Sequence, residues 1–123
     1  MAEILIIDDE PQIRRLLVRV LNGAGHRVCE ATNGRDGIEL FHRAHPALVI
    51  TDIVMPNQEG IETILTLRRD DRPVKIIAMS GHDQEMLETA RLIGADDIIE
   101  KPFRAHDLLN RVRALSTAPL ASP

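Results

Sequence analysis

Four short apolar runs in the chain each end at polar residues suited to phosphate chemistry. Asp8 and Asp9 follow the run at 4–7, and Asp52 follows the run at 48–51. Ser80 follows the run at 76–79, and Lys101 follows the run at 98–100. In an open parallel sheet the carboxyl ends of the strands line one crevice, so residues far apart in sequence meet there. The sequence therefore predicts a site at that crevice.

The three carboxylates of Asp8, Asp9 and Asp52 are expected to converge, because adjacent strands lie about 5 Å apart. Two unit charges near that distance repel by roughly 3 kcal/mol at an effective dielectric of about 20. Mg²⁺, a hard cation that prefers oxygen ligands, relieves such repulsion. Taken singly, Asp9 is explained as a helix cap, Asp8 as a solvated loop residue and Asp52 as a turn residue. Their combination favours a Mg²⁺ site.

An aspartate beside a divalent cation can act as a nucleophile that accepts a phosphoryl group. The hydroxyl of Ser80 and the ammonium of Lys101 are expected at the same crevice, where they can donate to phosphoryl oxygens. Phosphoryl transfer depends mostly on such positioning and electrostatic stabilisation. In isolation, Ser80 is better explained as a turn hydroxyl and Lys101 as a solvated strand end.

The apolar pattern alternates between short strands and amphipathic helices five times. We expect strands at 4–7, about 26–31, 48–52, 74–79 and 98–99, and helices at about 13–21, from 34 to before 46, 61–67, 83–93 and 105–115. This alternation predicts a three-layer, doubly wound α/β sandwich with a five-stranded parallel sheet of order 2-1-3-4-5 and five helices. Residues 1–115 are expected to form one domain, and 116–123 a tail or linker.

The composition limits the classes of function. Of 123 residues 44% are hydrophobic but only Phe41 and Phe103 are aromatic, so an aliphatic core is expected. The net charge of -4, with no basic cluster beyond short pairs, argues against direct binding of nucleic acid. The lone Cys29 rules out an internal disulfide, and no apolar stretch approaches the roughly 20 residues of a membrane span. A cytoplasmic domain without membrane insertion is therefore expected.

Four segments, in order, resemble the receiver domain of two-component response regulators over residues 3 to about 115. They are 6–10, 49–56 together with Gly60, 78–81, and 94–97 leading to 101–103. Each segment alone is a weak signal, whereas all four in this order are highly specific. The chain is similar to stand-alone receivers of the chemotaxis-regulator type, although the Pro-containing end suits a linker in a longer chain as well as a free tail.

The resemblance implies that Asp52 is phosphorylated by a histidine kinase or a phosphotransfer protein. It implies a Mg²⁺ ion held by Asp9, Asp52 and the backbone carbonyl of Val54, with Asp8 assisting through a bound water. It also implies a cis peptide bond at 101–102. The protein would then be a switch that assists its own phosphorylation and slow dephosphorylation, and not an enzyme.

The resemblance further implies roles for residues around the phosphoryl group. Ser80 and Lys101 would bind its oxygens, and the small Gly81 would leave access to it. Val54 and His82 occupy positions that vary in the family, and neither has a carboxylate or amide to orient an attacking water. A fairly long-lived phosphoryl group is therefore predicted.

One position departs from the family pattern. Receivers usually carry an aromatic residue three positions before the lysine, which turns inward as the residue equivalent to Ser80 moves; here the position is Ile98. The downstream protein partner is expected on the face formed by 83–93, 98–99 and 105–115. We predict that Ile98→Tyr alters affinity for that partner while leaving the phosphorylation rate nearly unchanged.

Three other functions share parts of this pattern. A haloacid-dehalogenase-type phosphatase normally has a second aspartate two residues after the nucleophile, where this chain has Val54. A flavin-binding module is disfavoured because the acidic loop at 8–10 would repel its phosphate. An interaction domain that is never phosphorylated stays open. The kinase, the output partner and the oligomeric state are not set by the sequence.

Overall fold

The computed structural model describes residues 3–55, 59–81 and 83–117. Its strands are β1 (Glu3–Ile7), β2 (Arg27–Ala31), β3 (Leu48–Asp52), β4 (Lys75–Ser80) and β5 (Asp97–Glu100). Its helices are α1 (Pro11–Gly23), α2 (Gly34–Ala44), α3 (Glu59–Arg69), α4 (Gln84–Ile93) and α5 (Ala105–Thr117). All neighbouring strands pair in parallel, in the order β2-β1-β3-β4-β5. The predicted fold class is confirmed.

The expected element boundaries differ from the observed ones by a few residues. For example, β2 begins one residue later than expected, and α5 continues to Thr117, two residues beyond the expected end. The division of the chain into a domain at 1–115 and a tail at 116–123 stays a prediction. No helix in the described ranges is both long and apolar enough to cross a membrane.

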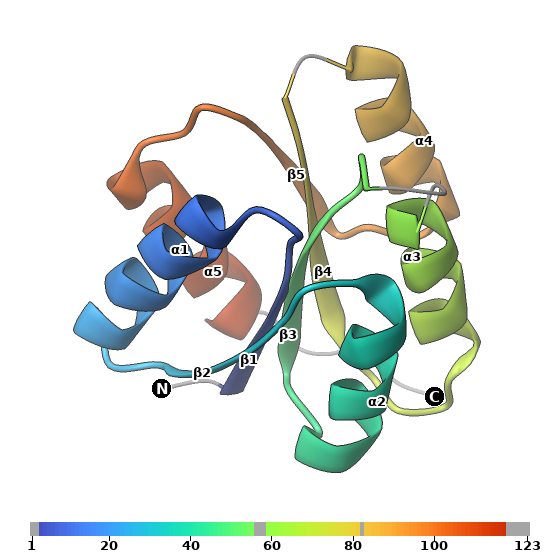
Figure 1. Cartoon of the computed structure of the whole chain (residues 1–123), viewed down its shortest axis with the longest axis horizontal. Helices are drawn as coiled ribbons and strands as arrows, with labels where there is room; N and C mark the ends of the chain where they lie inside the picture. The colour runs from blue at the N-terminus through green and yellow to red at the C-terminus, as the bar shows by residue number, and fades with distance from the viewer. Residues whose placement is uncertain (1–2, 56–58, 82, 118–123) are drawn as a thin grey trace.

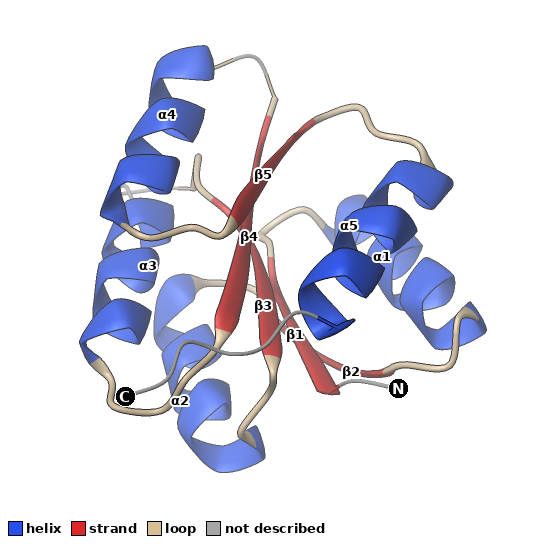
Figure 2. Cartoon of the chain, turned by 180° about the vertical axis from the view of Figure 1, so that it is seen from behind, coloured by secondary structure: helices blue, strands red, loops and turns tan. Residues whose placement is uncertain are grey.

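Helices cover both faces of the sheet (Figure 1). The α1/α5 face is the side covered by α1 and α5, and the α2–α4 face is the side covered by α2, α3 and α4, which the reverse view also shows (Figure 2). Because side chains alternate along a strand, Ile4 and Ile6 pack on the α1/α5 face while Leu5 and Ile7 pack on the α2–α4 face. The inner strands β1, β3 and β4 are largely apolar on both sides, as a doubly covered parallel sheet requires.

Short loops at the carboxyl edge of the sheet begin the next helix with defined caps. The Asn33 side chain accepts a hydrogen bond from the Asp36 N–H at 2.8 Å and so starts α2. The Asp83 side chain accepts one from the Met86 N–H at 3.0 Å and starts α4. These caps satisfy backbone donors that a helix N-terminus leaves free, and they fix where each loop returns to a helix.

Helix α3 is anchored at both ends. At its start, a Cβ added to Gly60 would lie 2.2 Å from the Ile53 Cα, so only glycine allows this close approach to the end of β3. At its other end, the Arg68 guanidinium donates to the Gly94 carbonyl at 2.8 Å and the Val74 carbonyl at 2.7 Å, and it pairs with a carboxylate that follows α4. Arg68 therefore ties α3 to the segments around β4.

Candidate functional site

Three charged side chains reach the crevice from three strand ends on the same face of the sheet. Asp8 follows β1, Asp52 ends β3, and Lys101 follows β5. Each lies two residues beyond a core residue of the α1/α5 face; these core residues are Ile6, Ile50 and Ile99. Because side-chain direction repeats every two residues, all three charged groups are brought to this face.

The Lys101 ammonium lies between the two aspartates. Its Nζ is 3.0 Å from Asp52 Oδ2 and 3.2 Å from Asp8 Oδ2, and a third carboxylate oxygen, Glu10 Oε1, is 3.4 Å away. Asp8 is completely buried and Asp52 is 3% exposed. The predicted convergence of Asp8, Asp52 and Lys101 is therefore found in the structure.

The two buried aspartates have matching hydrogen-bond patterns. Asp8 accepts from the N–H of Glu10 at 2.9 Å with its Oδ1, and Asp52 accepts from the N–H of Val54 at 3.1 Å with its Oδ1. Each aspartate thus uses one oxygen for the backbone two residues ahead and the other oxygen for Lys101. This arrangement fixes both carboxylates in orientation.

The surroundings shift two pKa values. Burial raises the pKa of Asp8 above its ordinary value of 3.8 and outweighs the backbone hydrogen bond and the attraction of Lys101. Burial lowers the pKa of Lys101, but the hydrogen bond and charge of Asp52, with those of Asp8, outweigh it, so the pKa lies above 10.5. Lys101 therefore stays charged at neutral pH, while the charge on Asp8 is only partly compensated.

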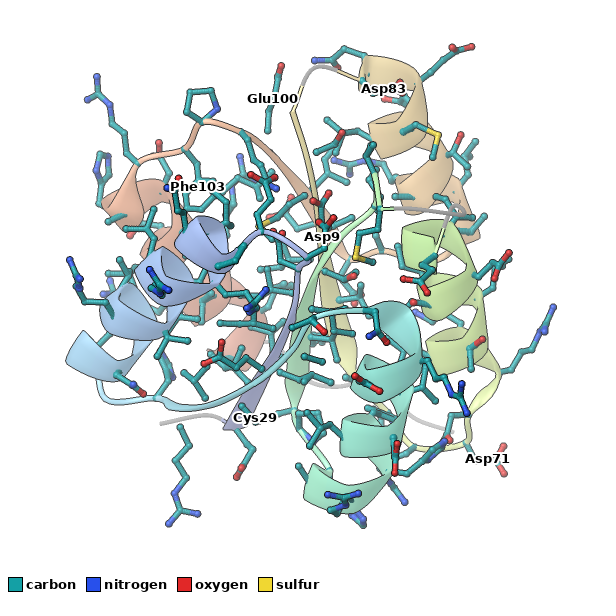
Figure 3. All side chains as sticks on the ribbon, in the orientation of Figure 1. Asp9, Cys29, Asp71, Asp83, Glu100 and Phe103 are labelled. Atoms are coloured by element: carbon teal, nitrogen blue, oxygen red, sulfur yellow. The ribbon has the colours of Figure 1, made fainter. Side chains whose placement is uncertain are left out.

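The crevice holds more carboxylates than one lysine can balance. One ligand oxygen each from Asp8, Asp9, Glu10 and Asp52 lies within 4.8 Å of the others. Asp9, labelled in Figure 3, and Glu10 are exposed and lie where the chain leaves β1 for α1. Oxygen donors in such a cluster are those that Mg²⁺ prefers, so these residues fit a Mg²⁺ ion. The ligand role expected for the Val54 carbonyl stays a prediction.

Ser80 lies at the crevice but on the other face of the sheet. It follows Ala78 by two residues, and Ala78 belongs to the core of the α2–α4 face. The Ser80 hydroxyl is buried and has no hydrogen-bond partner within the part of the chain that the structure describes. Its carbonyl accepts from the Lys101 N–H at 2.7 Å, and the peptide bond between Lys101 and Pro102 is cis, as expected.

The remaining predicted site residues lie around this centre. Ile98 is half-buried against the core of the α2–α4 face, the same face as Ser80. A Cβ added to Gly81 would meet nothing within 4 Å, which agrees with open space there. Val54 is 54% exposed beside the crevice. His82 lies outside the described residues, so its predicted place near the phosphoryl group stays a prediction.

Two residues without a predicted role contact this centre. Glu10 lies in the carboxylate cluster and contacts Lys101. Arg14 donates from Nη1 to the backbone carbonyl of Asp8 at 2.8 Å. The position of Glu10 directly after Asp8 and Asp9 could have indicated its place in the carboxylate cluster. The spacing of Arg14 in the sequence does not indicate its hydrogen bond to the Asp8 carbonyl.

Comparison with known proteins agrees with this fold. The family model of the response regulator receiver domain matches residues 4–113. The chain therefore belongs to the response regulator receiver domain family.

Individual relatives support the same assignment. A protein of Galdieria sulphuraria named "Probable transcriptional regulator ycf27" is 37% identical over 114 residues, which are 92% of this chain and 44% of that protein. A signal receiver domain from Bermanella marisrubri is 34% identical with a TM-score of 0.88, covering 94% of this chain and 98% of that one. The chemotaxis response regulator CheY4 of Vibrio cholerae is 26% identical with a TM-score of 0.86, over 94% and 98%. The chain spans less than half the length of the curated relative.

Proposed function

We propose that this receiver domain accepts a phosphoryl group on Asp52 from a phosphohistidine of a histidine kinase or phosphotransfer protein. A carboxylate oxygen of Asp52 attacks phosphorus, the new O–P bond forms, and the N–P bond to the histidine breaks. The observation that carries the proposal is the pairing of Lys101 Nζ with Asp52 at 3.0 Å inside a cluster of four carboxylates. The Asp52 carboxylate is thus an acceptor that the adjacent Lys101 ammonium orients.

The environment favours Asp52 over Asp8 as the acceptor. Asp8 is fully buried and burial raises its pKa, which disfavours the charged, nucleophilic form. Asp52 retains some exposure and is followed by Val54, whose side chain is open to solvent. A phosphoryl donor can therefore approach Asp52 from the Val54 side.

Mg²⁺, which Asp9, Asp52 and the Val54 carbonyl would hold with Asp8 assisting through a water, would supply positive charge that offsets repulsion between the carboxylates and the incoming phosphoryl group. Lys101 supplies a second positive charge and can donate to a phosphoryl oxygen from its present place between the aspartates. The buried Ser80 hydroxyl, without a partner among the described residues, has a donor left for another phosphoryl oxygen.

Phosphorylation is proposed to act as a switch and not as one step of an enzymatic turnover. Ser80 and Ile98 share the α2–α4 face of the sheet, so movement of Ser80 toward the phosphoryl group would alter packing there. We propose that this changes the binding of a downstream protein on α4, β5 and α5, in the cytoplasm, as a population shift between two packings. Transcriptional regulators among its relatives suit such a signalling role.

The test is incubation with acetyl phosphate and Mg²⁺, followed by intact-mass measurement. Wild type is expected to gain one phosphoryl group, and Asp52→Asn none. Asp71→Asn is the matched control, because Asp71 is an exposed aspartate far from the crevice (Figure 3). An adduct that persists in Asp52→Asn, or its absence from wild type at saturating acetyl phosphate, would contradict the proposal.

The same samples test how long the phosphoryl group persists. Val54 presents no acid or amide to orient an attacking water, so we expect the adduct to outlast rapid removal of acetyl phosphate and to decay slowly. Mass spectra taken at intervals after desalting measure this decay. Complete loss within seconds would contradict the expectation.

A further inference from the structure

Arg14 connects the acidic turn after β1 to the neighbouring edge strand β2. Its side chain is only 14% exposed, although it belongs to the first turns of a surface helix. Nη1 donates to the Asp8 carbonyl at 2.8 Å, and Nε donates to Glu30 Oε1 at 3.2 Å. One guanidinium therefore joins α1, β2 and the turn that begins the carboxylate cluster.

Local helix preferences do not explain a cation at this place. A positive charge near a helix N-terminus faces the positive end of the helix dipole, which is unfavourable. Glu10, at the N-cap of α1, makes no side-chain capping hydrogen bond, and the first turn of the helix contains no acidic residue. The contacts of Arg14 outside the helix are what offset this cost.

The contact with the Asp8 carbonyl orients one particular peptide group. That carbonyl belongs to the peptide joining Asp8 to Asp9, while the Asp8 N–H is held by the Ala31 carbonyl at 3.1 Å. With hydrogen bonds on both sides of its Cα, Asp8 has little freedom of backbone rotation. Arg14, together with the bond from the Glu10 N–H to Asp8 Oδ1, therefore restrains the plane of the Asp8–Asp9 peptide and with it the direction of Asp9.

Asp9 depends on this backbone because no other described residue holds its side chain by a hydrogen bond. Its carboxylate is exposed and makes no hydrogen bond to another described residue, yet its oxygen lies within 4.8 Å of ligand atoms from the other three acids. Asp8 and Asp52, by contrast, are each held by a backbone N–H and by Lys101.

We infer that Arg14, held in place by Glu30, is a positioning residue for the Asp8–Asp9 turn and thereby sets the affinity of the site for Mg²⁺. The inference rests on the proposed function, since it concerns the same ion site. Electrostatics alone gives the opposite expectation, because removing a nearby positive charge should strengthen the binding of a cation. The direction of the change in affinity therefore separates positioning from simple charge.

The experiment measures Mg²⁺ affinity by isothermal titration calorimetry and thermal stability by circular dichroism, on the full chain. Arg14→Met is expected to weaken Mg²⁺ binding about tenfold, as for loss of other groups that orient metal ligands. Arg14→Lys, which keeps the charge and one donor, should recover part of that loss. Glu30→Gln, which leaves Arg14 intact but loosens it, should weaken binding less than Arg14→Met does.

Arg15→Met is the matched control, because Arg15 is the adjacent, exposed arginine on α1 and its loss removes the same charge. It is expected to leave Mg²⁺ affinity unchanged or slightly stronger. Unchanged or tighter binding in Arg14→Met, or equal weakening in Arg15→Met, would overturn the inference. If Arg14→Met does not fold, the order of affinities among wild type, Glu30→Gln and Arg14→Lys decides it in the same way.

Two further results keep this inference separate from the proposed function. If wild type binds Mg²⁺ and is phosphorylated while the Arg14 variants bind equally well, only the positioning role is wrong. If wild type does not bind Mg²⁺, both proposals fail. A lower melting temperature with unaltered Mg²⁺ affinity at 25 °C would show that Arg14 is structural only, and would likewise overturn the inference.

Discussion

The Lys101→Met substitution tests whether one ammonium holds the carboxylate cluster together. Its Nζ lies 3.0 and 3.2 Å from the oxygens of Asp52 and Asp8. At an effective dielectric of about 20 each contact is worth about 5 kcal/mol of attraction before desolvation is subtracted. Because the lysine side chain is only 13% exposed, screening by solvent is limited. Methionine keeps the apolar stem, so the change removes charge more than packing.

We expect Lys101→Met to lower the free energy of unfolding by about 3 kcal/mol at pH 7 without Mg²⁺. Removal of one partner of a buried ion pair costs about 3–5 kcal/mol, because it leaves the other charge buried and unpaired. Protonation of the unpaired carboxylate limits the loss of stability. The difference in the free energy of unfolding between the variant and wild type should therefore shrink as the pH is lowered toward 4. The melting temperature should fall by about 10 °C.

Urea denaturation of wild type, Lys101→Met, Asp52→Asn and the double variant completes a thermodynamic cycle. Loss of Lys101 should cost less when Asp52 is already neutral, and we expect a coupling energy of about 2–4 kcal/mol. If the two effects add to within about 0.5 kcal/mol, the ammonium and the carboxylate act independently and the reasoning about this site is refuted.

Four further outcomes are expected. Because the pKa of Asp8 is raised in the folded state, protonated Asp8 stabilises the fold at low pH and this contribution is lost as the pH rises through the raised value. In urea denaturation without Mg²⁺, Asp8→Asn should therefore be more stable than wild type at pH 7, and the difference in the free energy of unfolding should shrink as the pH is lowered. Arg68→Met should lower the free energy of unfolding by about 2–3 kcal/mol, since two carbonyls lose this donor and the Asp96 carboxylate keeps, among the described donors, only the Ile76 N–H; a loss below about 0.5 kcal/mol would show that the anchor is unimportant. Gly60→Ala should destabilise by at least about 2 kcal/mol while Gly81→Ala, whose Cβ meets nothing within 4 Å, stays close to wild type, and equal melting temperatures would contradict the steric argument. Ile98→Tyr should change the affinity of the phosphorylated domain for its output partner, measured by pull-down quantification, with nearly the same rate of phosphorylation; a large loss of that rate would refute the separation.

Most of the fold was predictable because four of the five strands are short apolar runs followed or ended by polar residues. The runs before Asp8, Asp52 and Lys101 gave the place of the site, since parallel strands share one carboxyl edge. The exact ends of β2 and α5 were not predictable, because fraying at element ends depends on neighbouring segments and not on periodicity.

The orientation of side chains within the site was less accessible from the sequence. Ser80 pairs with Glu100 in the register of β4 against β5. Because side chains alternate along a strand, this register places Ser80 and Lys101 on opposite faces of the sheet, and the sequence alone does not give the register. The contacts of Glu10 and Arg14 depend on how far flexible side chains reach between elements, and spacing along the chain carries no information on that reach. The carboxylate cluster was predicted, but the residues that orient it were not.

The division of the site between two faces of the sheet has a consequence for how such a protein can diversify. Asp52 and Lys101 lie over one hydrophobic core, and Ser80 and Ile98 over the other. Substitutions in the core beneath α1 and α5 would act first on the charged pair, while substitutions in the core beneath α2, α3 and α4 would act first on Ser80 and Ile98. A paralogue could therefore change the packing around Ser80 and Ile98 while it keeps the packing beneath Asp52 and Lys101, because alternate side chains of the same strands enter opposite cores.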